Sequence, residues 1–356
     1  MVEWKKLGDI CELERGVRVI KKDLQEGGLV PVYQNSLTPL GYFDKSNYPE
    51  NTPFVICAGA AGEVGICSKP FWAADDCTCI LCSSSANKKY IYYCLLVNQH
   101  TLKSQVRKAS VPRLSKDVIG KLIVPIPSMS EQERIVGILD TFTSSIDNLK
   151  QQIAQRRKQY EYYRDQLLDL EGKEGVEKRV LKEVCEVING RAYSQPELLD
   201  KGKYRVLRVG NFFSNDSWYY SDLELEDKYY CNKGDLLYAW SASFGPHIWE
   251  EEKVIYHYHI WKMNCKEALD TKYMYYWLQS EDMKKQAFSN LHGATMAHLT
   301  KVLMESLKVP VPSLSEQQRI VDILDKFEAS IQNLEAQLSQ REKQYEYYRN
   351  KLLTFD

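Results

Sequence analysis

Ten cysteines are the first residues of this 356-residue chain whose chemistry could define a site. Cys79 and Cys82 form one CxxC motif flanked by Cys77, which suits a metal ion or a redox pair. No second CxxC or HxxxH follows at zinc-finger spacing. Most cysteines lie in apolar, strand-like runs, so we interpret them as buried, reduced thiols and keep a metal site as the alternative.

Other residue groups that could support catalysis are also incomplete. His257-Tyr258-His259 would place both imidazoles on one face of a strand, but no carboxylate or cysteine ligand accompanies them, which favours a structural or DNA-contacting role. Gly59, Gly62 and Gly65 lack the dinucleotide-binding spacing and indicate a β-bend. The sequence has no Walker A loop, no G-x-S-x-G elbow and no Asn/Asp-Pro-Pro-aromatic motif of base methyltransferases. We therefore predict a non-catalytic protein with no metal ligands and no cofactor of its own.

Composition and charge limit the function classes further. With 44% hydrophobic and 27% charged residues the chain is typical of a globular protein of two or three domains. It contains no apolar run of membrane-helix length and opens on no signal peptide, so we expect it in the cytoplasm. Its net charge is −1, and only residues 1–123 show an excess, 16 Lys and Arg against 12 Asp and Glu. DNA binding would therefore depend on local clusters and on a partner.

A long internal repeat organises the chain. Residues 124–170 and 309–355 align at a shift of 185, with 30 of 47 positions identical, including Val-Pro-x-Pro-Ser-x-Ser-Glu-Gln and Lys-Gln-Tyr-Glu-Tyr-Tyr-Arg. Each copy begins after a Pro-x-Pro stretch, with Ser130 and Glu133, or Ser315 and Gln318, spaced as a capping box. We predict two helices of about 40 residues, each about 60 Å long.

Apolar residues in both copies recur at alternating steps of four and three, the seam of a coiled coil. The predicted seam residues are Ile135, Leu139, Phe142, Ile146, Leu149, Ile153, Arg156, Tyr160, Tyr163, Ile320, Leu324, Phe327, Ile331, Leu334, Leu338, Arg341, Tyr345 and Tyr348. An antiparallel pair within one chain, with a pseudo-two-fold axis, would bury both seams. Two separate helices, each packed on its own domain or on another copy, are the alternative. Arg156 and Arg341 could fix the register, bond to a partner or extend to solvent.

The segments before each helix indicate two domains of mixed strands and short helices, which gives an α+β fold. We divide the chain into a first domain (1–123), a central helix (124–170), a second domain (171–308) and a C-terminal helix (309–356). The two domains begin alike, with Cys11 matching Cys185 and Gly16 matching Gly190, and then diverge. Two domains with a similar backbone but different surface residues are expected if each domain recognises something different.

Two variable domains alternating with helices that begin P-x-P-S-x-S-E-Q-x-R-I-V-x-I-L-D resemble the specificity (S) subunit of type I restriction–modification enzymes. The Asp235-Leu236-Leu237-Tyr238-Ala239-Trp240-Ser241 run and Gly62…Phe71-Trp72 also look like its target-recognition domains. The resemblance covers essentially the whole chain. It implies that each domain recognises one half of an asymmetric, bipartite double-stranded DNA site and that the helix pair sets the spacer.

The resemblance also implies partners. Two methyltransferase (M) subunits would dock on the helices and methylate adenine with S-adenosylmethionine, and nuclease–translocase (R) subunits would complete the complex. Mg and ATP, like S-adenosylmethionine, would belong to these partners. The alternatives are a coiled-coil scaffold that binds no DNA, and a specificity subunit of a type II-like fused nuclease–methyltransferase.

Candidate DNA-binding residues are the polar, aromatic and basic side chains of the variable domains, because arginine pairs with guanine, asparagine and glutamine pair with adenine, and lysine meets phosphate. They are Arg15, Arg18, Lys21, Gln34, Asn35, Arg107, Lys108, Arg113, Arg191, Tyr193, Arg205, Arg208, Asn211, Ser241, Ser243, His257 and His292.

Overall fold

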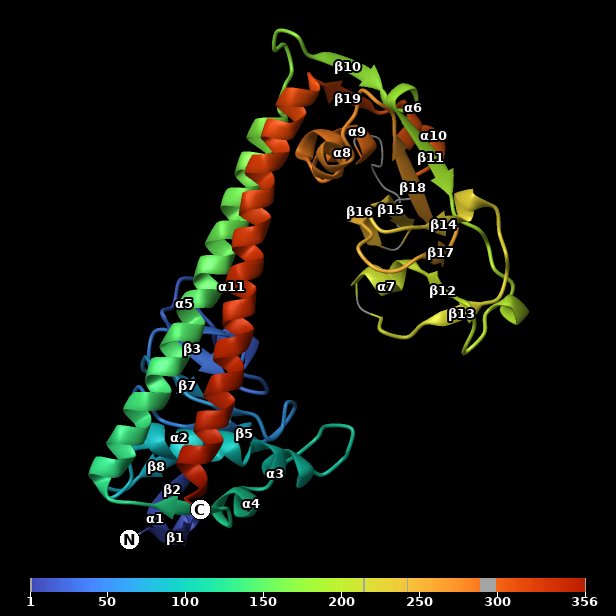
Figure 1. The fold of residues 1–356 in the computed structure, drawn as a ribbon. Helices are drawn as coiled ribbons and strands as arrows, with labels where there is room; N and C mark the ends of the chain where they lie inside the picture. The colour runs from blue at the N-terminus through green and yellow to red at the C-terminus, as the bar shows by residue number, and fades with distance from the viewer. Residues whose placement is uncertain (1, 214, 242, 289–298, 356) are drawn as a thin grey trace. The chain divides into compact units, whose positions relative to one another are not determined.

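The computed structural model describes residues 2–213, 215–241, 243–288 and 299–355 and has an α+β fold (Figure 1). It divides into two compact units, Met1–Gln151 with Glu335–Asp356, and Gln152–Leu334. The long helices α5 (Met129–Leu168) and α11 (Leu314–Thr354) therefore each contribute one part to each unit. We call the part of the chain before α5 the first domain, and the part between α5 and α11 the second domain.

The first domain consists of small, mostly antiparallel sheets and short helices. Strand β1 pairs with β9, and a second sheet has the order β2-β8-β5-β6. A three-stranded sheet has the order β4-β3-β7, in which β3 and β7 are parallel. The elements are β1 (Glu3–Lys6), α1 (Leu7–Ile10), β2 (Cys11–Arg15), η1 (Lys21–Asp23), β3 (Val30–Tyr33), β4 (Gly41–Phe43), β5 (Phe54–Ile56), β6 (Val64–Gly65), β7 (Trp72–Ala73), β8 (Cys77–Cys82), α2 (Lys88–Val97), α3 (Gln99–Ser104), α4 (Lys116–Gly120) and β9 (Ile123–Ile126).

The second domain repeats this order of pairing. Strand β10 pairs with β19, one sheet has the order β11-β18-β15-β16, and the other has the order β13-β12-β17-β14. Its elements are β10 (Glu177–Val180), α6 (Leu181–Val184), β11 (Cys185–Asn189), η2 (Gln195–Glu197), β12 (Tyr204–Leu207), α7 (Val209–Phe213), β13 (Tyr219–Ser221), η3 (Asp227–Tyr229), β14 (Tyr230–Cys231), β15 (Leu236–Ser241), β16 (Ser243–Ile248), β17 (Val254–Tyr256), β18 (Ile260–Cys265), α8 (Thr271–Trp277), α9 (Glu281–Phe288), α10 (Lys301–Ser306) and β19 (Lys308–Val311).

The matching glycines mark the same close approach of backbones in both domains. A Cβ on Gly16 would lie 2.2 Å from the Ala74 carbonyl oxygen, and one on Gly190 would lie 2.4 Å from the His257 carbonyl oxygen. Any side chain at these positions would collide with backbone, so only glycine fits. The weak sequence similarity of the two domain openings thus reflects a shared backbone arrangement.

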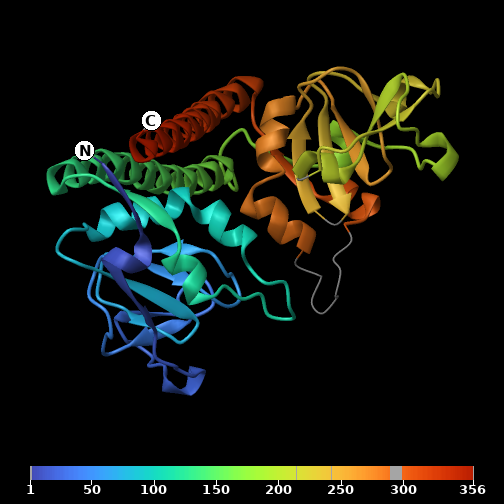
Figure 2. The same cartoon turned by 90° about the horizontal axis from the view of Figure 1, so that it is seen from below.

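Buried glutamines and tyrosines join each domain to the helix that follows it. Gln132 and Gln317 are fully buried, and the Oε1 atom of each accepts a 2.8 Å hydrogen bond from a backbone N–H at the start of α2 or α8. The hydroxyls of Tyr90 and Tyr273 donate at 2.8 Å to the carbonyl oxygens of Pro125 and Pro310. Helix α2 thereby lies against α5 in the first unit (Figure 2).

The helices begin slightly earlier than the capping-box pattern predicts. Helix α5 starts at Met129, and Ser128 accepts backbone bonds from Glu131 and Gln132 through its carbonyl oxygen. In the second copy the Ser313 hydroxyl accepts from the Glu316 backbone N–H at 3.3 Å. The capping role that we predicted for Ser130 and Ser315 was therefore wrong; the serine two residues earlier ends the extended Pro-x-Pro segment.

The parts of α5 and α11 within each unit contact one another antiparallel. In the first unit Phe142 stacks on Tyr348, and the guanidinium of Arg341 lies 5.7 Å from the Phe142 ring. In the second unit Phe327 stacks on Tyr163, and the guanidinium of Arg156 lies 5.9 Å from the Phe327 ring. The same three residue types therefore recur with the copies exchanged. Each arginine thus contacts an aromatic ring of the facing helix, an arrangement that differs from the three roles considered for it.

Other seam residues lie either between the helices or against a domain. Ile135, Leu139, Ile320 and Leu324 are fully buried in the cores of their own domains. Tyr160 is buried in the second domain, and Tyr345 packs on the core of the first. Ile146 is buried, and the partly buried seam positions are Leu149, Ile153, Ile331, Leu334 and Leu338.

Candidate nucleic-acid interface

Three cations of the first domain line one small cleft. Arg15 at the end of β2, Arg113 before α4 and Lys116 at the start of α4 border a cavity of about 220 Å³. The acidic residues Asp75 and Asp76 line it as well, and the Arg15 guanidinium lies 3.6 Å from the Asp75 carboxylate. Arg15 donates from Nε to the Asp75 carbonyl oxygen at 2.6 Å and is 65% exposed. Arg15 and Arg113 were candidates from sequence. Lys116 was missed, although it lies in the short segment Leu114–Lys116 that resembles residues 299–301.

The loop between α3 and α4, residues 107–113, is an exposed basic loop (Figure 1). Its ends are closed by backbone hydrogen bonds between Arg107 and Arg113, at 2.9 and 3.2 Å. In the part of the chain that the structure describes, no carboxylate lies within ion-pair distance of Arg107, Lys108 or Arg113. Exposed cations without acidic partners suit contact with DNA phosphate.

Asn35 lies beside the basic loop, because Gly59 joins the two segments. The Gly59 N–H donates to the Pro112 carbonyl oxygen at 3.3 Å, and the Asn35 carbonyl accepts from the Ala60 N–H at 2.9 Å. Gln34 precedes Asn35 and is half-buried. The structure thus brings Arg15, Gln34, Asn35, Arg107, Lys108 and Arg113 to neighbouring segments.

The other two candidates of the first domain lie apart from this group. Arg18 and Lys21 are exposed and follow Gly16 toward the sheet of β3, β4 and β7, where Val19 is buried. They could contact DNA only through a different part of the domain surface.

In the second domain a cation and aromatic rings gather around His257. The Tyr193 ring stacks on His257 at 6.4 Å, and the Arg191 guanidinium lies 5.1 Å from the Tyr193 ring. Arg191 also donates to Glu197 at 2.6 Å. The Nη1 atom of Arg191 and the hydroxyl of Tyr193 are buried without a hydrogen-bond partner among the described residues. Such groups usually find a partner in water or ligand, so polar groups are available here.

The two histidines do not share a strand: His257 forms an isolated β-bridge with Arg191, and His259 lies in the turn that follows. His257 and His259 lie between β17 and β18, with ring centroids 4.9 Å apart. Our prediction that a strand would present both imidazoles was therefore wrong, because the chain reverses at Tyr258. Burial, His259 and Arg208 together lower the pKa of His257 to about 4. His257 is therefore neutral near pH 7 and can both donate and accept a hydrogen bond.

Two of the remaining candidates are engaged within the protein. Arg205 pairs with Glu251 at 2.9 Å and stacks over Trp218. The Asn211 amide bonds the backbones of Arg208, Asn215 and Ser217 and so stabilises a local turn. These contacts favour structural roles.

The other candidates of the second domain vary in exposure. Arg208 is exposed beside Tyr219, and Ser241 is half-buried at the end of β15. Ser243 begins β16, and its side chain is outside the description. His292 lies outside the described residues.

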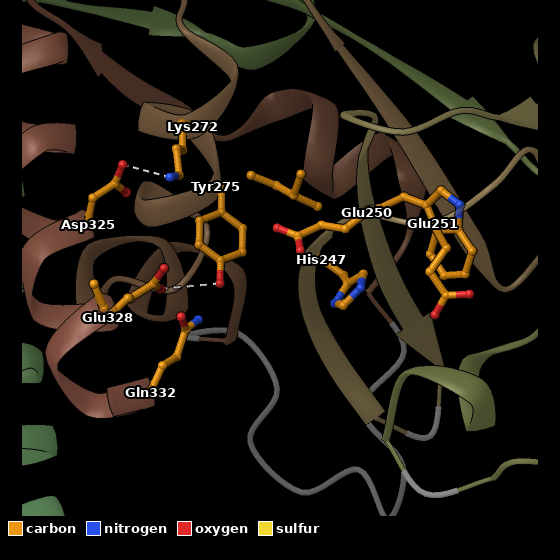
Figure 3. A pocket seen from close by; sticks show the side chains of 11 residues that line it. His247, Glu250, Glu251, Lys272, Tyr275, Asp325, Glu328 and Gln332 are labelled. Atoms are coloured by element: carbon orange, nitrogen blue, oxygen red, sulfur yellow. Dashed lines mark hydrogen bonds and ion pairs between the residues drawn. The ribbon is translucent and has the colours of Figure 1, made fainter. Parts of the chain in front are cut away.

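A cavity of the second unit, between the second domain and α11, is acidic. A cleft of about 680 Å³ is lined by Glu250, Glu251, Asp325 and Glu328, with Lys272 and His247 (Figure 3). Lys272 pairs with Asp325 at 2.6 Å, and Glu328 accepts from the hydroxyls of Tyr160, Tyr275 and Tyr276. Burial raises the pKa of Glu328. Excess carboxylate would repel phosphate, so this cleft is a poor surface for DNA.

Two further properties of the described residues bear on function. No helix among them is long and apolar enough to cross a membrane. Within the same ranges, no group of three or more His, Cys, Asp or Glu residues could hold a metal ion.

Comparison with known proteins gives a consistent family match. The model of the type I restriction modification DNA specificity domain matches residues 1–156 and again 173–342. The chain is 27% identical over 390 residues to the specificity subunit of the Escherichia coli type I restriction enzyme EcoR124I/EcoR124II, covering 99% of this chain and 94% of that protein.

Solved structures share the fold. The S subunit of a type I restriction–modification system from M. genitalium superimposes with a TM-score of 0.68 at 18% identity, covering 99% of this chain and 96% of that one. A chain from a study of complex assembly and conformational transition in a type I system gives a TM-score of 0.61 at 16% identity, with 99% and 97% covered.

Proposed function

The chain belongs to the family of type I restriction modification DNA specificity domains, and from this premise we propose that it recognises an asymmetric, bipartite DNA site for a methyltransferase. Each domain recognises one half-site, and the chain itself performs no catalysis. The proposal assigns residues 1–123 and 171–308 to the two recognition domains, and residues 124–170 and 309–356 to the helices that connect them.

One observation carries the proposal: the two domains share a strand order but differ in the residues at equivalent loop positions. Cys11 pairs with Cys82 as Cys185 pairs with Cys265, so Asp75 and Asp76 correspond in register to Tyr258 and His259. A shared strand order that carries different polar side chains in its loops suits recognition of two different base sequences.

The nature of each face indicates how it would contact DNA. The basic loop gives the first domain phosphate contacts, and its arginines, Arg107 and Arg113, are able to bond guanine. The second domain offers neutral His257 with Tyr193, Arg191 and Arg208. We place its DNA contact at this cluster and away from the acidic cleft, whose carboxylates disfavour a phosphate backbone.

The helices supply the spacer. A helix of 40 residues is about 60 Å long. At about 3.4 Å per base pair, this length limits the bipartite site to about 17 base pairs. The half-sites would then lie about one helical turn apart, on one side of the duplex.

Partners complete the activity. Two methyltransferase subunits would dock on the helix pair, because the repeat presents the same side chains twice, and nuclease–translocase subunits would join them. S-adenosylmethionine, Mg and ATP would be bound by those subunits. The assembly studied in the structurally similar type I system supports such a complex. Its substrate would be the double-stranded DNA of the cytoplasm.

Sequencing of methylated adenines in cells with and without this chain tests the proposal. We expect one asymmetric, interrupted motif that is methylated only when the chain is present, and co-purification of a methyltransferase. A chain that self-associates, recruits no methyltransferase and leaves the methylation pattern unchanged would support the scaffold alternative and refute the proposal.

A further inference from the structure

Each domain carries a pair of cysteines at the same place in its sheet. Cys11 is the first residue of β2 and lies opposite Cys82, the last residue of β8. Cys185 is the first residue of β11 and lies opposite Cys265, the last residue of β18. On β2 and β11 the cysteine is followed by a glutamate in both domains, whereas β8 and β18 share only their final cysteine, so the second cysteine of the pair recurs where the other side chains of its strand have changed.

The backbone hydrogen bonds define the geometry of both pairs. The Ser83 N–H donates to the Ile10 carbonyl oxygen at 3.4 Å, and the Lys266 N–H donates to the Val184 carbonyl oxygen at 2.8 Å. In each case the backbone hydrogen bond joins the residue before one cysteine to the residue after the other. This pattern identifies the two cysteines as a non-hydrogen-bonded pair of an antiparallel ladder. In such pairs the Cα atoms are about 4.5 Å apart and the side chains are closest. A disulfide accepts Cα separations of about 4.4–6.8 Å, so both pairs lie within its range.

The two cysteines of each pair differ in exposure. Cys11 and Cys185 are buried, whereas Cys82 and Cys265 are partly exposed. A hydrogen bond between the thiols raises the pKa of Cys11, while the same contact and Lys88 lower the pKa of Cys82. A small oxidant therefore meets the partly exposed cysteine of each pair first, and the buried cysteine lies opposite it in the strand register.

We propose that Cys11–Cys82 and Cys185–Cys265 are cross-strand dithiols that close to disulfides when the protein meets a peroxide. The sulfur of Cys82 or Cys265 attacks hydrogen peroxide: an S–O bond forms and the O–O bond breaks. The products are a sulfenic acid on that cysteine and one water molecule. The buried sulfur then attacks that sulfur, the S–O bond breaks, and its hydroxyl leaves with the thiol proton as a second water. Two thiols and one peroxide thus give one disulfide and two waters.

The position of each pair connects it to the joint between domain and helix. The segment after Cys82 provides the Ser85 carbonyl and the Asn87 N–H that bond Gln132 of α5. The segment after Cys265 provides the Ala268 carbonyl and the Asp270 N–H that bond Gln317 of α11. A disulfide would fix the strand end from which each joint begins and would make the joint more rigid.

Other cysteines provide internal controls. Cys94 is a buried thiol whose pKa is raised by burial and by the nearby Cys82 sulfur, so it is a competing partner for Cys82. Cys57 is partly exposed, like Cys82, but its thiol lies 3.1 Å from the Thr78 hydroxyl. Cys57→Ser is therefore the matched control.

The full-length chain provides the test. We would treat the reduced protein with hydrogen peroxide, block free thiols with N-ethylmaleimide and map the peptides without reduction by tandem mass spectrometry. We expect peptides joined through Cys11–Cys82 and Cys185–Cys265, and a higher Tm for the oxidised chain. Cys82→Ser and Cys265→Ser, at the partly exposed positions, should each abolish one cross-link and leave the other. Cys57→Ser should retain both.

Three results would overturn the proposal. One is recovery of Cys82 and Cys265 only as over-oxidised or alkylated residues without cross-links. Another is a Cys82–Cys94 bond in place of Cys11–Cys82. The third is the same cross-links in denatured protein as in native protein, which would show that the fold does not direct the pairing. None of these results depends on DNA recognition, so the two proposals can fail separately.

Discussion

Replacing Gln317 with alanine should destabilise the second unit far more than replacing its neighbour Gln318. The Gln317 amide is fully buried and makes three hydrogen bonds of 2.8–2.9 Å, to the Asp270 N–H and to the carbonyls of Ala268 and Pro312. Gln318 is exposed and bonds only Asp322 on the surface of the same helix. Gln317 therefore joins α11, the Pro-x-Pro segment and the start of α8.

The expected loss follows from the groups left without partners. Truncation leaves one buried N–H and two carbonyls, and a buried unsatisfied group costs about 1–3 kcal/mol. Because carbonyls near a helix start can bond water after small shifts, we expect about 3 kcal/mol in total. For a unit of this size that lowers the Tm by about 6–12 °C. Gln318→Ala should change the free energy of unfolding by less than about 0.5 kcal/mol.

Thermal unfolding followed by circular dichroism, with hydrogen exchange resolved by unit, measures this difference. Protection should fall in α8 and the start of α11 and stay unchanged in α2, where Gln132 makes the equivalent bonds. Gln317→Glu should not rescue stability, because its carboxylate would face two carbonyl oxygens. Equal stability of Gln317→Ala and Gln318→Ala would refute the argument that this buried amide holds the joint.

Three further predictions follow from the same structure. Replacing the three cations of the basic loop with alanine should weaken DNA binding and reduce the slope of log K against log salt by up to about 3. Lys121→Ala, at an exposed lysine outside the loop, should change that slope by at most about 1. DNA-binding titrations at several salt concentrations measure both slopes. The pKa of His257 is lowered to about 4 from 6.5, so as the pH falls the unfolded chain takes up the proton first, and stability is lost below about pH 6.5. Between pH 7 and 5 we expect the free energy of unfolding to fall by about 1 kcal/mol, after allowing for the half-exposure of this residue. Urea unfolding measures this loss, which should be absent in His257→Gln. Gly190→Ala should cost about 3 kcal/mol, because its Cβ would lie 2.4 Å from a carbonyl oxygen, while Gly137→Ala, with open space around it, should be neutral or stabilising in the same assay.

The sequence predicts the parts of this fold that rest on local periodicity and repetition. The duplicated segment with its four-three spacing gave both long helices to within two residues of their starts. The equivalence of Gly16 and Gly190 was visible as a weak sequence similarity. Both domains have glycine there because a Cβ at this position would collide with backbone.

Features that depend on contacts between distant segments were not predictable in this way. The pairing of β1 with β9, or of Cys11 with Cys82, is fixed by strand register, which a single sequence does not encode locally. The buried role of Gln132 and Gln317 was hidden, because their position beside Glu131 and Glu316 suggested an exposed first turn. The turn at Tyr258 interrupts a run of β-forming residues without any glycine or proline to mark it.

Replacement of the second domain by a copy of the first is the measurement that tests the central claim most directly. Adenine methylation would be mapped in cells that express the exchanged chain with the methyltransferase that we propose as its partner. If each domain recognises its own half-site and the helices alone set the distance, the methylated motif becomes palindromic, with the original first half-site repeated at the original spacing. A motif that stays asymmetric, or one whose spacing changes while the helices are intact, would contradict the account.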